Sequence, residues 1–93
     1  MTNEINASHI LVKTEKEAKE ALESIKKGSS FESIAQEKSF CPSNKNGGAL
    51  GWFGRGMMVK EFEEACFSSK KGEIIGPVKT EFGFHVIKIN ELN

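Results

Sequence analysis

The chain contains two histidines, and each lies in a short run of apolar residues. His9 stands within residues 8–12, and His85 stands within residues 83–89. An imidazole in a strand-like apolar run is expected in or near the core, where its hydrogen-bond partners fix its tautomer. We therefore expect the two rings to lie against each other.

A glycine-rich and aromatic segment, residues 47–58, lies between the two histidines. It has too many glycines for a helix and too many aromatic and sulfur-containing side chains for an ordinary solvated loop. Its glycines, at positions 47, 48, 51, 54 and 56, are also explained by turns alone. The segment is therefore a third candidate for a functional role.

The residue types allow several chemistries. A thiol beside a histidine is typical of a nucleophilic hydrolase, but Cys41 lies between Phe40 and Pro42, without a nucleophile elbow. Cys41 and Cys66 lack the paired spacing of a zinc site or a disulfide framework, so we expect two free thiols. The histidines also fit a purely structural pair of core imidazoles, bonded to each other or to a hydroxyl such as that of Thr80.

Length and composition limit the function classes. The 93 residues are expected to form one domain, 1–93, with a single core. The 13 basic and 13 acidic side chains balance, which argues against nucleic acid as the main partner because phosphate binding needs a basic excess. The sequence shows no membrane span and no signal-peptide pattern. We therefore expect a cytoplasmic protein.

A strand followed by a helix is predicted at the start of the chain. Residues 5–13 are rich in β-branched and apolar side chains, which is typical of a strand. Thr14 and Glu17 have the spacing of a capping box, and apolar residues then recur at helical spacing. Gly28 is expected to end this helix.

A second, short helix is indicated by Ser29 with Glu32, three positions later. Residues 40–48 are predicted to form a loop, because proline, asparagine and glycine are frequent there. Residues 50–53 are then predicted to form a short strand.

A third helix is expected from Val59, with residues 70–72 closing it. Residues 74–79 and 84–91 are the last two predicted strands. The resulting order is βααβαββ, an α+β domain with a mostly antiparallel sheet.

Several segments, taken in this order, resemble the parvulin family of peptidyl-prolyl cis/trans isomerases. Each segment alone is weak evidence, but together they cover nearly the whole chain. They are residues 7–13, residues 47–56, Met58 with Phe62, residues 72–73, residues 76–78 and residues 80–87.

The resemblance implies a parvulin/FKBP-like fold, in which helices surround a four-stranded sheet and a proline-binding cleft lies on one side. In the family two strand histidines face each other beneath the cleft, and His9 and His85 match them. Thr80 matches the hydroxyl residue of the same network, and Cys41 matches the polar residue of the cleft. The predicted catalytic residues are therefore His9, Cys41, Thr80 and His85.

The resemblance also implies which residues bind substrate. Leu50, Met58 and Phe62 match the apolar pocket for the proline ring. Phe82 falls where members differ according to the residue they accept before proline, which implies a preference for apolar residues. Phosphate-directed members carry a longer basic loop after the first strand, whereas here Lys13 runs directly into the helix. We therefore do not expect phosphate selectivity.

The predicted function is peptidyl-prolyl cis/trans isomerisation in protein folding, by a monomer that acts without a covalent step, a cofactor or a metal. The expected partners are proline-containing polypeptides, including unfolded and nascent chains. The main alternative is a binding module or chaperone domain that uses the same cleft without significant turnover.

Overall fold

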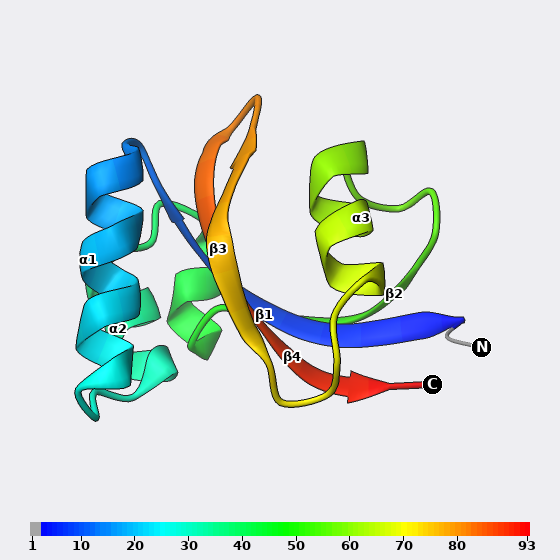
Figure 1. The fold of residues 1–93 in the computed structure, drawn as a ribbon, viewed down its shortest axis with the longest axis horizontal. Coiled ribbons are helices and arrows are strands. Elements are labelled where there is room, and N and C mark those ends of the chain that lie inside the picture. The colour runs from blue at the N-terminus through cyan, green and yellow to red at the C-terminus, as the bar shows by residue number, and fades with distance from the viewer. Residues whose placement is uncertain (1–2) are drawn as a thin grey trace.

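The computed structural model describes residues 3–93 (Figure 1). Among these residues, no helix is long and apolar enough to cross a membrane. The predicted α+β class and the order βααβαββ are confirmed, with one short 3₁₀ helix added. The elements are β1 (Glu4–Val12), α1 (Glu15–Lys26), α2 (Phe31–Lys38), the 3₁₀ helix η1 (Pro42–Asn46), β2 (Ala49–Gly54), α3 (Lys60–Phe67), β3 (Ile74–Thr80) and β4 (Gly83–Leu92).

The four strands form one sheet in the order β2-β1-β4-β3, and every neighbouring pair is antiparallel. The first and last strands of the chain are therefore the two central ones. Their far ends are joined by the backbone N–H of Asn3, which donates to the carbonyl of Asn93 at 2.6 Å. This pairing places both described ends of the chain at the same edge of the molecule, as Figure 1 shows.

Helices cover the two faces of the sheet differently. Figure 1 shows α1 and α2 on one side and α3 on the other. Since side chains alternate along a strand, each central strand contributes to both faces. On the α1/α2 face, Ile10, Val12 and Val86 are buried against the two helices. On the α3 face, Ile87 and other residues of the central strands pack with Phe53, Phe62 and Cys66.

Helix α1 begins and ends where the sequence predicts. The hydroxyl of Thr14 accepts a hydrogen bond from the backbone N–H of Glu17 at 3.2 Å and donates to the Glu17 carboxylate at 3.0 Å. At the other end, Gly28 follows the C-cap with φ of +113°. The Thr14 cap pairs a backbone N–H group that the first turn of a helix otherwise leaves without a partner.

The predicted start of α2 is wrong by one residue. The N-cap is Ser30, whose hydroxyl accepts from the backbone N–H of Ser33 at 3.0 Å. The backbone N–H of Ser29 instead donates to the carbonyl of Ser24, so Ser29 belongs to the end of α1. Ser29 and Glu32 therefore do not form the predicted capping pair.

The end of α3 and the predicted loop 40–48 also differ from the prediction. Helix α3 ends at Phe67 with Ser68 as its C-cap, because Ser69 turns its hydroxyl back onto the carbonyl of Ala65. Residues 70–72 therefore lie beyond the helix rather than closing it. Within the predicted loop 40–48, residues Pro42–Asn46 form η1, which begins with a proline as helices often do.

Candidate active site

The two histidines lie on adjacent central strands and on the same face of the sheet. His85 pairs with Leu11 across β1 and β4, so His9 is its diagonal neighbour on the α3 face. Their Nδ1 atoms are 2.9 Å apart, which is a hydrogen bond with the proton on one ring and the acceptor on the other. The ring centroids are 5.1 Å apart. The expected contact between the rings is confirmed.

Thr80 extends this pair into a chain of buried polar groups. Its Oγ1 lies 2.7 Å from Nε2 of His85 and accepts a hydrogen bond from the backbone N–H of Phe82 at 3.2 Å. The arrangement that uses most of these groups has the Thr80 hydroxyl donating to His85, and Nδ1–H of His85 donating to His9. Within residues 3–93, Nε2 of His9 then remains without a partner.

Burial keeps both histidines neutral. It lowers the pKa of His9 from 6.5 to about 4, and the nearby His85 contributes to the same shift. Burial likewise lowers the pKa of His85 from 6.5 to about 4. Removing a charged imidazolium from water is unfavourable, so the neutral form is stabilised. Near pH 7 the pair therefore carries no charge.

Phe62 connects the histidine pair to the cavity described next. This α3 residue is buried, and its ring packs edge-on against both imidazoles. The centroid distances are 5.6 Å to His9 and 5.2 Å to His85. Such edge-to-face contacts are favourable between aromatic rings. A substitution of either histidine is therefore expected to change the packing of the Phe62 ring.

A cavity of about 500 Å³ opens between β1, η1 and α3. Its lining is mostly apolar. All the predicted substrate-binding residues line it, as do the predicted catalytic residues His9, Cys41 and His85. Thr80 does not line the cavity but bonds to His85, which does. The lining residues are His9, Leu11, Phe40, Cys41, Pro42, Leu50, Met57, Met58, Val59, Phe62, Phe82 and His85.

The sequence did not single out five of these lining residues. Leu11 had a usable signal, because it lies two positions after His9 on the same strand and so shares its face. Phe40 and Met57 are 58% and 68% exposed, and they neighbour the predicted residues Cys41 and Met58. Pro42 and Val59 are the other two.

Three lining residues are unusually exposed for large apolar side chains. Phe82 is 64% exposed, comparable to Phe40 and Met57. They come from three separate connections, namely the turn between β3 and β4, the segment before η1, and the segment before α3. We call Phe40, Met57 and Phe82 the rim of the cavity.

The hydroxyl of Ser39 joins Cys41 to β1. The buried hydroxyl of Ser39 accepts from the N–H of Leu11 at 2.9 Å and from the N–H of Cys41 at 3.4 Å. After η1, the carbonyl of Gly48 accepts from the N–H of His9 at 2.9 Å. A side chain at Gly48 would collide with the carbonyl oxygen of His9, so the close approach requires glycine.

The two cysteines differ in position, since Cys41 lines the cavity and Cys66 does not. Cys66 is fully buried on the α3 face, and burial raises the pKa of its thiol to about 12. Residues 3–93 contain no group of three or more histidine, cysteine or acidic side chains placed to hold a metal ion. Cys41 and Cys66 are both free thiols, as expected.

The chain matches one protein family along almost its whole length. The family is described as Rotamase, PPIC-type PPIASE domain, and the match covers residues 4–91. Among curated proteins, the foldase protein PrsA of Geobacillus kaustophilus (strain HTA426) is 56% identical over 88 residues. That match covers 94% of this chain and 31% of the relative. The chain therefore spans about a third of the length of this relative.

Solved structures show the same fold. The parvuline NmPin of Nitrosopumilus maritimus is 44% identical with a TM-score of 0.88, and the match covers 98% of this chain and 99% of that one. The peptidylprolyl isomerase PrsA of Bacillus anthracis is 43% identical with a TM-score of 0.96, covering 99% of this chain and 43% of that one.

Proposed function

The chain belongs to the PPIC-type peptidyl-prolyl cis/trans isomerase family, the parvulins, and from this premise we propose that its cavity binds and isomerises X-Pro bonds in polypeptides. The family and fold predicted from the sequence are confirmed. One observation carries the proposal beyond the family name. The mostly apolar cavity of about 500 Å³ contains Leu50, Met58 and Phe62 together with Cys41 and the histidine pair.

The physics of the reaction suits such a cavity. Rotation about a peptide bond has a barrier of about 18–20 kcal/mol, because the C–N bond is partly double. In the twisted state this resonance is lost and the amide becomes less polar, so a water-poor, uncharged cavity favours it over the planar amide. Lowering the barrier by roughly 5 kcal/mol gives an acceleration of several thousandfold. Rotation neither breaks a bond nor consumes a cofactor.

In this proposal the lining residues have separate roles. Leu50, Met58 and Phe62 hold the proline ring, while the preceding carbonyl rotates past Cys41. The histidine pair and Thr80 set the shape and polarity beneath Phe62 and transfer no proton. Their neutrality near pH 7 supports this assignment, because an uncharged pair leaves the twisted amide in a weakly polar environment.

The proposal includes a preference for apolar residues before proline. Phe82 contributes exposed aromatic surface at the rim, and Phe40 adds a second ring at the same cavity. Both rings favour an apolar neighbour, which loses less hydration than a charged one on entering. The proposed substrates are proline-containing segments of unfolded or nascent chains. A cytoplasmic location and a monomeric state stay predictions.

Exchange spectroscopy by NMR tests the proposed reaction. A short Leu-Pro peptide with resolved cis and trans signals is measured alone and with a small amount of protein. We expect the exchange rate to rise in proportion to the protein concentration and to fall with Met58→Ala. Unchanged exchange at protein concentrations that bind the peptide would contradict the proposal.

The rim favours one alternative, a holding chaperone without significant turnover. Phe40, Met57 and Phe82 present apolar surface outside the predicted proline pocket. A chaperone would suppress aggregation of a proline-free unfolded protein, whereas an isomerase would accelerate only proline-limited refolding. Comparing both assays on the same preparation separates the two functions.

A further inference from the structure

Residues 56–59, between β2 and α3, form one wall of the cavity. Met57, Met58 and Val59 all line it. Residues 56–58 belong to neither a helix nor a strand, and Val59 is the N-cap of α3. Gly56 has a φ of +87°, in the left-handed region that other residues rarely adopt. We therefore expect contacts from other residues to hold this segment in position.

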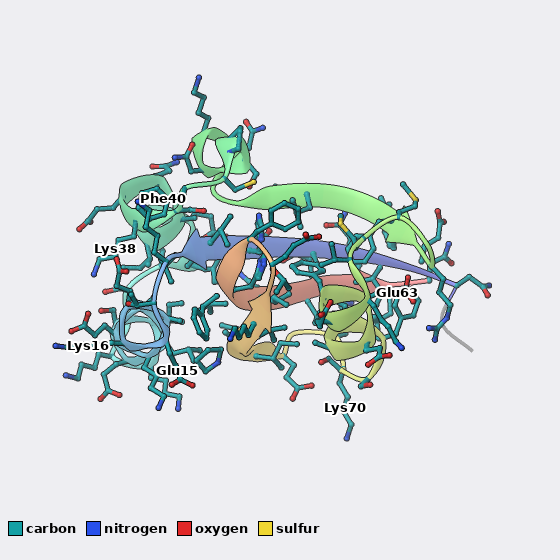
Figure 2. All side chains as sticks on the ribbon, turned by 90° about the horizontal axis from the view of Figure 1, so that it is seen from above. Glu15, Lys16, Lys38, Phe40, Glu63 and Lys70 are labelled. Atoms are coloured by element: carbon teal, nitrogen blue, oxygen red, sulfur yellow. The ribbon has the colours of Figure 1, made fainter. Side chains whose placement is uncertain are left out.

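Glu63, on the first part of α3, contacts both ends of this segment. Its carboxylate Oε1 accepts a hydrogen bond from the backbone N–H of Gly56 at 2.5 Å. Its own backbone N–H donates to the carbonyl of Val59 at 2.9 Å. Figure 2 shows Glu63 on α3 where the chain arrives from β2. The Val59 bond belongs to the first turn of α3 and does not depend on the side chain at position 63, so the specific contribution of Glu63 is the bond from its carboxylate to Gly56.

The surroundings of the Glu63 carboxylate strengthen this anchor. Its side chain is only 17% exposed, and its Oε2 lies 3.7 Å from Nη1 of Arg55. The Arg55 guanidinium stacks over the Phe67 ring of α3, with 4.1 Å between its central carbon and the ring centroid. The hydrogen bond to Gly56 lies at the surface, and the charge of the carboxylate makes it stronger than a bond between two neutral groups.

We propose that Glu63 is a positioning residue, which holds the wall that carries Met58 in the geometry that receives the proline ring. The inference rests on the proposed isomerase function. Glu63 does not line the cavity, and it acts through the Gly56 backbone. Because the wall contacts the ring in both the planar and the twisted states, loosening it weakens binding of both equally. The expected signature is therefore a raised KM with little change in kcat.

The experiment compares Glu63→Ala with Glu64→Ala on the full chain. Glu64 is the next residue of α3, but it is exposed and pairs only with the exposed Lys60 at 3.9 Å. For Glu63→Ala we expect KM for a Leu-Pro peptide to rise about tenfold, the effect of losing one charged hydrogen bond. For Glu64→Ala we expect KM within about twofold of wild type, because exposed ion pairs contribute little.

Conservative variants identify the contact that matters. Glu63→Gln keeps an oxygen that can accept from Gly56 but loses the charge and the Arg55 pair, so its KM should lie between those of wild type and Glu63→Ala. Glu63→Asp keeps the charge but shortens the side chain, so it should raise KM, and it serves if the alanine variant does not fold. Hydrogen exchange at the Gly56 amide should accelerate in the aspartate and alanine variants and remain slow in the glutamine variant.

Two results would overturn the assignment. Folded Glu63→Ala or Glu63→Asp with the KM of Glu64→Ala would show that the wall needs no anchor. A KM for Glu63→Gln as high as that for Glu63→Ala would show that the Gly56 bond is not the working contact. Wild-type turnover is measured first, so absence of any isomerisation there rejects the proposed function rather than the role of Glu63.

Discussion

The two faces of the sheet use the same strands for different purposes. On the α1/α2 face, Ile10, Val12 and Val86 are almost completely covered, because two helices lie across the central strands. On the α3 face, helix α3 has eight residues, and part of the face opens into the cavity instead. The first face is closed, whereas the second combines a buried cluster around Phe53 and Cys66 with the histidines and the site.

This division shows how a small domain combines stability with an open site. Strand alternation places neighbouring residues on opposite faces, so Ile10 lies in the core while His9 and Leu11 face the cavity. The incomplete cover on the second face is what leaves room for substrate. Substitutions on the first face should therefore change stability alone, and those of residues that line the cavity should also change binding or turnover.

Replacing adjacent residues of β1 gives the largest expected effects and tests this division directly. Ile10→Ala creates a void in the covered core and should lower the free energy of unfolding by about 2–5 kcal/mol. Leu11→Ala, at the cavity, should cost less because Leu11 is only partly buried, but it should raise KM for a proline peptide. Urea unfolding and peptide kinetics on both variants check this.

A changed KM for the folded fraction of Ile10→Ala would contradict the separate roles of the two faces. So would a Leu11→Ala variant that loses as much stability as Ile10→Ala and keeps the KM of wild type. Either result would mean that the sheet transmits changes from one face to the other.

Protonation of the histidine pair on the α3 face should have the next largest effect, a loss of folding stability at low pH. The folded-state pKa of each ring is lowered to about 4, whereas an unfolded chain has the ordinary value of 6.5. As the pH falls below about 6.5, the histidines of the unfolded chain become protonated, while those of the folded protein stay neutral. Stability is therefore complete above pH 6.5 and lost as the pH falls toward about 4. For one histidine the full loss is roughly 3 kcal/mol.

Urea unfolding at pH 7 and pH 5 measures this loss. His9→Phe, which keeps an aromatic ring but removes one titrating group, should show a smaller difference. Ile10→Ala should show the same difference as wild type. Equal stability of wild type at both pH values would contradict the neutral buried pair.

A thiol substitution should have a smaller effect, confined to the cavity. Cys41 lies beside the proposed path of the rotating carbonyl, but rotation needs no nucleophile. We therefore expect Cys41→Ser to retain activity within about tenfold of wild type, a change of about 1.4 kcal/mol in the barrier. Stability should change little, because Cys41 is only partly buried. Complete loss of turnover, or a covalent peptide adduct detected by mass spectrometry, would indicate thiol catalysis.

Most of the fold was predictable because its signals are local. Runs of β-branched and apolar residues identified the strands, and the Thr14 cap identified the start of α1. The misplaced start of α2 shows the limit, since Ser29 and Ser30 are equally good caps by residue type. Only the backbone bond from Ser29 to Ser24 decides between them. The 3₁₀ helix η1 was missed because five residues are too few to show a period.

The site was predictable only in part, for a different reason. The family resemblance supplied the residues that now surround the cavity, including Leu50 and Phe62. It gave no information about Met57 or Glu63, whose roles depend on how the segment before α3 folds back onto the helix. The contact between Lys13 and the Phe40 ring, at 5.0 Å, likewise joins segments far apart in the sequence.

The smallest expected effect concerns the rim and substrate choice. We expect peptides with Leu, Phe or Met before proline to be turned over faster than those with Glu or phosphoserine, because Phe82 offers apolar surface and no charge. Phe82→Ala should narrow this gap by a few fold, comparable to removing one hydrophobic contact. Since Phe82 is 64% exposed, stability should be unchanged. A matched peptide series on wild type and variant measures the gap.

Lys13 is the residue that could oppose this preference for apolar residues before proline. Its Nζ lies over the ring of the rim residue Phe40, so a positive charge stands close to the cavity mouth. Clustered cations, best in bidentate geometry, recognise phosphate, and a lone exposed lysine held by a cation–π contact is a weak substitute. Lys13→Ala should therefore leave the order of the peptide series unchanged. Faster turnover of the phosphoserine peptide by wild type, abolished by Lys13→Ala, would show that the lysine outweighs Phe82 and that the rim selects for charge.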